Sequence, residues 1–155
     1  MKVLFVSSGN SKNGISPITK AQGESLENVG IKVHFFTIQG KGFKGYLKNV
    51  LPLRRYVRKQ HFDVIHAHYS LSALVATIAG CRPLVVSLMG SDIRLGFLIK
   101  NAIKISYLLI WDDLIVKSQD MADNLGIDKS KIIPNGVNTS LLKHYNKFLL
   151  KEWQF

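Results

Sequence analysis

The chain is poor in cysteine and in acidic residues, and each shortage narrows what it can be. One residue of 155 is cysteine, Cys81, which excludes an internal disulfide framework, and no cluster of cysteine and histidine predicts a zinc ribbon. The first residues, MKVLFVSSGN, contain an apolar run too short for a signal-peptide core or a membrane span. We therefore expect a cytoplasmic protein without a membrane-spanning segment.

Acidic residues number 10 against 21 lysines and arginines, so the formal net charge is +11. A charge of this size predicts an anionic partner: nucleic acid, a phosphate-bearing ligand or an anionic membrane surface. Residues 41–59 contain no acidic residue and interleave their basic residues with apolar ones, which is typical of a basic amphipathic segment. For the membrane surface we expect contacts from Lys44, Lys48, Arg54, Arg55, Arg58 and Lys59.

Repeats and low-complexity segments are also absent, and apolar runs alternate with helical patterns along the chain. Strands are expected at 2–7, 31–38, 63–68, 83–89, 113–118 and 131–133, with helices between them and a bend or break of the basic helix near Pro52. This alternation predicts an α/β, Rossmann-like, doubly wound parallel sheet with helices on both faces. We expect one domain at 1–137 and a short helical tail at 138–155.

Ligands of such sheets bind at the carboxyl ends of the strands, where loops and helix amino-termini converge. Small or polar residues follow nearly every expected strand, which is unusual for structural punctuation alone. The candidate residues for binding an acceptor or a phosphate are Gly14, Ser16, His66, His68, Tyr69, Ser70, Gly90, Ser91, Asp92, Ser118, Asn135 and Gly136.

The loop after the first strand has no GxGxxG and no Walker lysine pattern, so no motif supports dinucleotide or P-loop binding. It is either a plain turn, or Gly14 and the following helix start hold a phosphate or a sugar. The stretch GSDI, 90–93, has two interpretations as well. Its glycine, hydroxyl and carboxylate could read ligand hydroxyls, or Asp92 could cap the next helix.

The stretch DVIHAHYS, 63–70, places His66 and His68 on one face of a strand, because strand side chains alternate. A shared ligand is geometrically possible, but no third metal ligand lies at convincing spacing, so we expect no metal. The histidines are either satisfied structural residues or hydrogen-bonding groups for a polar ligand, and we favour the latter.

Three motifs in this order, FDVIHAHYSLSALVA, PLVVSLMGSDI and KIIPNGVN, resemble the amino-terminal domain of the family-four retaining glycosyltransferases of GT-B fold. The first thirty residues resemble the subgroup that includes teichuronic-acid-type polysaccharide glycosyltransferases. The resemblance covers residues 1 to about 140. It implies the acceptor-binding half of an enzyme whose second domain binds a nucleotide-sugar.

The resemblance also implies roles for particular residues. Gly14 matches the family's glycine-rich loop that faces the donor phosphates, and residues 66–70 match the loop on the acceptor side. Residues 90–92 match the HGxD-type loop, and residues 134–137 match the stretch that leads into the interdomain hinge. Many members have histidine where this chain has Met89, so no catalytic histidine is carried over and the catalytic residues stay unassigned.

Only eighteen residues follow Val137, so we expect the donor site to be missing and this chain alone to be inactive. The expected partners are a glycan or lipid-linked acceptor, an anionic membrane surface at the inner face of the membrane, and a separate donor-domain polypeptide. A nucleotide-sugar is expected only with that second domain. We expect no cofactor in this chain and no nucleic-acid partner.

Two other functions remain open from the sequence. A basic nucleic-acid-binding module would fit the charge, but its aromatic residues should lie on an exposed sheet or recognition helix, whereas these strands read as buried. A stand-alone α/β ligand-binding module of the flavodoxin type would not need the PNGV hinge, 134–137.

Overall fold

Six parallel strands form one open sheet in the computed structural model, which describes residues 1–12, 14–90, 97–127 and 130–136. The strand order is β2-β1-β3-β4-β5-β6, so β1 lies between β2 and β3. The strands are β1 (Lys2–Ser8), β2 (Lys32–Ile38), β3 (Val64–His68), β4 (Leu84–Ser87), β5 (Asp113–Val116) and β6 (Lys131–Ile132). Every strand lies within or close to its predicted range. The predicted tail, 138–155, is outside the described residues.

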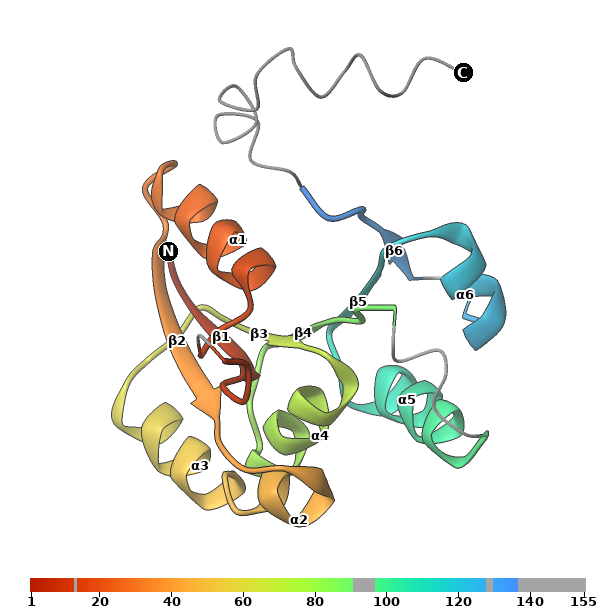
Figure 1. Ribbon diagram of the computed structural model, residues 1–155, viewed down its shortest axis with the longest axis horizontal. Coiled ribbons are helices and arrows are strands. Elements are labelled where there is room, and N and C mark those ends of the chain that lie inside the picture. Colours follow the sequence, from red (N-terminus) through yellow and green to blue (C-terminus); the bar gives the residue numbers. More distant parts are fainter. Residues whose placement is uncertain (13, 91–96, 128–129, 137–155) are drawn as a thin grey trace.

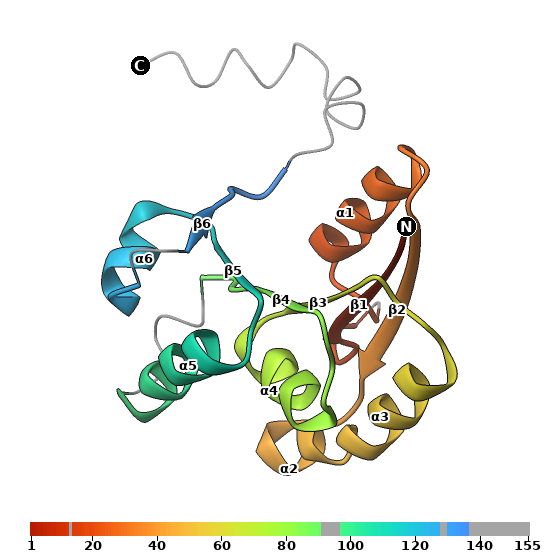
Figure 2. The same cartoon turned by 180° about the vertical axis from the view of Figure 1, so that it is seen from behind.

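The helices cover both faces of this sheet, which confirms the doubly wound prediction (Figures 1 and 2). Helix α1 lies on one face, while α2, α3 and α4 lie on the other in both views. The helices are α1 (Pro17–Glu27), α2 (Gly42–Leu47), α3 (Val50–Lys59), α4 (Ser70–Ala79), α5 (Phe97–Leu109) and α6 (Gln119–Leu125).

The apolar core lies between the sheet and α3, α4 and α6. Leu4 and Val6 of β1 are fully buried there with Val75 and Ala76 of α4. Because side chains alternate along a strand, Phe5 points to the opposite face, where its ring meets Phe35 of β2 edge-on at 5.6 Å. The sheet thus separates this core, which also contains Phe62 and Trp111, from the aromatic face on the side of α1.

The prediction for the basic segment was wrong about the position of the break. The helix is interrupted at Lys48 and Asn49, between α2 and α3, and not near Pro52. The side-chain amide of Asn49 donates to the carbonyl oxygen of Gly45 at 2.8 Å. The side-chain oxygen of Asn49 accepts from the backbone N–H of Gln39 at 3.1 Å. Pro52 lies in the first turn of α3, where its missing N–H has no intrahelical partner to lose.

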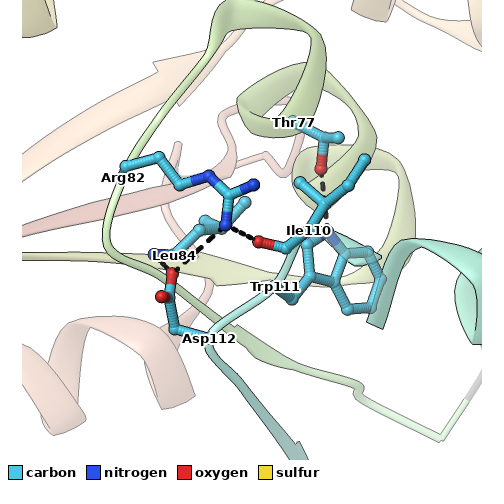
Figure 3. Close-up of polar contacts among 6 residues, drawn as sticks. All are labelled: Thr77, Arg82, Leu84, Ile110, Trp111 and Asp112. Carbon is cyan, nitrogen blue, oxygen red and sulfur yellow. Dashed lines mark hydrogen bonds and ion pairs between the residues drawn. The ribbon is translucent and has the colours of Figure 1, made fainter. Parts of the chain in front are cut away.

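At the amino-terminal edge of the strands, a set of polar contacts ties β4 to the segment before β5 (Figure 3). The Leu84 amide donates to the Asp112 carboxylate at 2.7 Å, and the Arg82 guanidinium donates to the Ile110 carbonyl beside the same carboxylate. The Trp111 indole N–H donates to the Thr77 hydroxyl of α4 at 2.8 Å. These bonds hold the buried indole against α4.

Candidate functional site

The strand order places a topological switch point between β1 and β3. From β1 the chain turns to α1 on one face, and from β3 it turns to α4 on the other (Figure 1). In open parallel sheets, the divergence of two such loops leaves a crevice at the carboxyl ends of the strands, where ligands bind. The loop after β1 and the residues from His66 to Ser70 meet this requirement.

The loop after β1 is a tight turn tied to the loop after β2. Gly14 has φ +78°, and its amide donates to the Ser11 carbonyl at 2.9 Å. The Asn10 side chain pairs with both backbone groups of Gly40, at 2.8 and 2.9 Å. No atom lies within 4 Å of a Cβ built on Gly14, so the turn leaves open space above its backbone.

His66 and His68 lie side by side on the face of β3 that α1 covers, as the alternation predicts. Their ring centroids are 4.2 Å apart, and the ring of Phe5 packs against both at 5.1 and 4.5 Å. His66 Nε2 makes a 2.7 Å hydrogen bond with the Ser87 hydroxyl of β4. The two histidines therefore contact an aromatic ring of β1 on one side and, through His66, a hydroxyl of β4 on the other.

Both imidazoles are neutral over the physiological pH range. Burial, and to a smaller extent the positive charge of Lys117, lowers the pKa of His66 to about 4. For His68, burial first, then His66 and Lys117, lower the pKa well below its usual value. Burial also lowers the pKa of Lys117. Each neutral ring offers one N–H donor and one acceptor nitrogen.

His68 is the least satisfied polar residue of this face. The residue is 2% exposed, yet neither ring nitrogen has a hydrogen-bond partner among the residues that the structure describes. The hydroxyl of Ser7, on the adjacent strand β1, is buried as well, and none of the described residues is its hydrogen-bond partner. Buried polar groups are nearly always hydrogen-bonded in native proteins, so these atoms indicate a site for a polar ligand or water.

Tyr69, the residue after this histidine, has a strained backbone. Its φ is +82° with ψ 146°, a region that non-glycine residues rarely occupy. The strain is held by its amide, which donates to the Ser87 carbonyl at 2.8 Å, and by its carbonyl, which accepts from Ala73 at 3.0 Å. Such strain costs about 1–3 kcal/mol and concentrates at functional sites, which favours a binding role for this turn.

Comparison with known families assigns the chain. The model for glycosyltransferase family 4 matches residues 13–141. The chain belongs to this family. One similar solved structure, a sucrose-phosphate synthase from Thermosynechococcus elongatus, has a TM-score of 0.63 and 19% identity, and the match covers 92% of this chain and 93% of that chain. At this identity the likeness concerns the fold, and no curated protein matches the sequence.

The remaining predicted residues of this glycosyltransferase domain lie in different places. Ser16 and Ser118 cap α1 and α6, with their hydroxyls accepting from Thr19 and Met121 amides. Gly90 follows β4 with φ +89° and open space around it, while Ser91 and Asp92 are outside the described residues. Asn135 and Gly136 are exposed beyond β6, three strands away from β3.

Two residues of this family-4 domain that act on His66 and His68 were not predicted from the sequence. They are Ser87, which makes a hydrogen bond with His66, and Lys117, whose charge lowers both histidine pKa values. Ser87 is a buried polar residue within the apolar run of β4, and this interruption of the run is the signal in the sequence that indicates it. Lys117 follows β5, two strands from β3, so only the strand order brings its charge near the histidines. Where the structure describes the chain, no group of three His, Cys, Asp or Glu side chains could hold a metal ion.

Proposed function

We propose that this glycosyltransferase domain binds the sugar acceptor, through the strand-end residues of β1 and β3. The observation that carries the proposal is His68, whose two ring nitrogens are buried without partners at the switch point. A neutral imidazole can donate one hydrogen bond and accept another, which suits a sugar hydroxyl. The strained Tyr69 turn and the open space at Gly14 support a ligand at the same edge.

The nucleotide-sugar donor then binds a second Rossmann-like unit, on this polypeptide or on another. Family resemblance supports this division, since Gly14 matches the loop that faces the donor phosphates from the acceptor side. We further propose that the acceptor is a glycan or a lipid-linked saccharide of cell-surface polysaccharide synthesis, as in the teichuronic-acid-type enzymes that the first thirty residues resemble. Residues 1–155 by themselves should not transfer sugar.

Saturation-transfer difference NMR tests the assignment of the acceptor site. We expect the 155-residue chain to give saturation transfer to simple alkyl glycosides, and only weak transfer to UDP or UDP-glucose. The physical reason is that His68, the residue expected to meet the ligand, is a neutral hydrogen-bonding imidazole without a charge to pair with a pyrophosphate. Tight binding of UDP-glucose would place the donor in this domain and contradict the proposal.

Replacing His68 by leucine separates the binding role from a structural one. Leucine is similar in volume and removes two buried, unpartnered polar atoms, so we expect the free energy of unfolding to rise by about 1 kcal/mol. Saturation transfer to the alkyl glycosides should fall at the same time. The measurements are urea unfolding followed by circular dichroism, and the same NMR experiment.

His66→Leu is the matched control, because it deprives the buried Ser87 hydroxyl of its partner and should destabilise the domain. If His68→Leu destabilised the domain as much and left glycoside binding unchanged, His68 would be a structural residue only.

The domain is also proposed to be peripheral on an anionic membrane. Where the structure describes it, no helix is long and apolar enough to cross a bilayer. All six residues predicted for the membrane surface are exposed, on α2 and α3 and in the link between them: Lys44, Lys48, Arg54, Arg55, Arg58 and Lys59. Phe43 and Leu51 stand 58% and 61% exposed among these charges, which supports shallow insertion into the bilayer.

A further inference from the structure

Lys117 lies on the same face of the sheet as the two histidines of β3. Val116 of β5 and Ala67 of β3 are fully buried in the core on the other face. Because side chains alternate along strands, Lys117 points to the face of His66 and His68. The effect of its charge on both imidazoles agrees with this placement.

Strand register places Lys117 at the end of a row of polar side chains. Ser7 of β1 lies next to His68 of β3, and His68 pairs with Ser87 of β4. Ser87 pairs in turn with Ile115 of β5, and Lys117 follows Ile115 by two residues. Two hydroxyls and an imidazole are thus followed by an ammonium group at the carboxyl edge of the sheet.

The surface between His66 and Lys117 is partly accessible. Val85 of β4 and Ile115 of β5 are half-buried on this face, whereas Val86, on the other face, is fully buried. These two aliphatic side chains form an apolar floor with polar groups at its ends. Such a floor suits a saccharide ring, which has apolar C–H faces and polar groups at its edge.

Lys117 is a half-buried cation without a counter-charge in the described part of the chain. The nearby carboxylates before and in β5, Asp112 and Asp113, form ion pairs with Arg82 and Lys131 instead. Burial lowers the pKa of Lys117, which shows that its ammonium group is partly removed from water. A desolvated charge is costly unless it is paired, so Lys117 indicates that a ligand supplies the negative charge.

We propose that Lys117 selects an acceptor saccharide that carries a carboxylate, binding the carboxylate while His68 binds a hydroxyl of the same molecule. The proposal rests on the proposed acceptor function and names the substrate class. One ammonium group among neutral imidazoles and hydroxyls balances a single negative charge. A phosphate monoester has about 1.5 to 2 negative charges at pH 7 and would remain partly uncompensated.

Saturation-transfer difference NMR titrations with three small ligands test this selection. We expect the wild-type chain to bind methyl glucuronide about tenfold more tightly than methyl glucoside, a difference of about 1.4 kcal/mol. Glucose 6-phosphate should bind more weakly than the glucuronide. Tighter binding of glucose 6-phosphate would overturn the choice of a carboxylate, and equal binding of glucuronide and glucoside would overturn the selection itself.

Lys117→Met should abolish the preference for the glucuronide, because methionine retains the length of the side chain but not its charge. The removal of a desolvated cation should not lower the melting temperature. Lys117→Arg should restore the preference, since it restores the charge. Lys32→Met is the matched control with the same loss of net charge, because Lys32 is exposed at the first residue of β2, on the opposite edge of the sheet. An equal loss of preference in Lys32→Met would contradict a role for Lys117 in particular.

Failure of this proposal and failure of the acceptor assignment give different results. If both glycosides bind and Lys117→Met changes neither affinity, Lys117 selects nothing and the acceptor assignment stands. If glucuronide binding depends on Lys117 but is unchanged in His68→Leu, the carboxylate site stands and the acceptor role of His68 is contradicted. If neither glycoside binds to the wild-type chain, both proposals are wrong.

Discussion

Lowering the pH from 6.5 to about 4 will destabilise this domain markedly. In the unfolded chain His66 becomes protonated below its usual pKa of 6.5, whereas in the native state it stays neutral until about pH 4. Between these values the unfolded state binds more protons, so the free energy of unfolding falls as the pH falls. The slope is roughly 1.4 kcal/mol per pH unit for each such histidine, and His66 alone accounts for about 3 kcal/mol. The lowered pKa of His68 acts in the same direction.

Urea unfolding at a series of pH values measures this effect, with His66→Gln as the test variant. Glutamine does not titrate, so the variant should lose part of the acid dependence. His61→Gln is the control for the replacement of a histidine as such, because the His61 side chain is 91% exposed and no buried imidazole is removed. If wild type and His66→Gln lost stability in parallel between pH 6.5 and 4, burial of the neutral imidazole would not be the cause.

Replacing Arg54, Arg55 and Arg58 by glutamine will weaken binding to anionic vesicles by about a hundredfold. All three side chains are exposed on α3, and their spacing of three and four residues gathers them on one side of the helix. Each basic residue close to an anionic bilayer contributes roughly 1 kcal/mol, so three together amount to about 3 kcal/mol.

Co-sedimentation with phosphatidylcholine vesicles that contain phosphatidylglycerol measures this binding at moderate salt. Replacing Lys12, Lys20 and Lys32 by glutamine gives a control with the same change in net charge, since these exposed lysines belong to neither α2 nor α3. Equal weakening by both triple variants would mean that overall charge, and no particular surface, attracts the membrane. A preference for duplex DNA over the vesicles would favour a nucleic-acid partner.

Local patterns predicted most of the fold because each depends on neighbours in the sequence. The run KVLFVS predicted a buried strand, and β1 extends from Lys2 to Ser8. Ser16 before Pro17 predicted the start of α1, where the Ser16 hydroxyl accepts from the Thr19 amide. The break near Pro52 was predicted wrongly, because the side chain of Asn49 and the close approach of Gly40 to Gly45 decide where the chain turns.

By itself the sequence determined the alternation of strands and helices, the shared face of His66 and His68, and the basic character of 41–59, because these follow from periodicity and composition. Only the tertiary structure decided that β1 lies between β2 and β3, that Ser87 bonds His66, and that Lys117 acts on both histidines. An apolar groove lined by Phe43, Leu71, Ala102 and Trp111 likewise combines residues of α2, α4, α5 and the segment before β5. The physical reason is that burial, pKa and cavity shape depend on contacts between distant segments, which strand order and helix packing create.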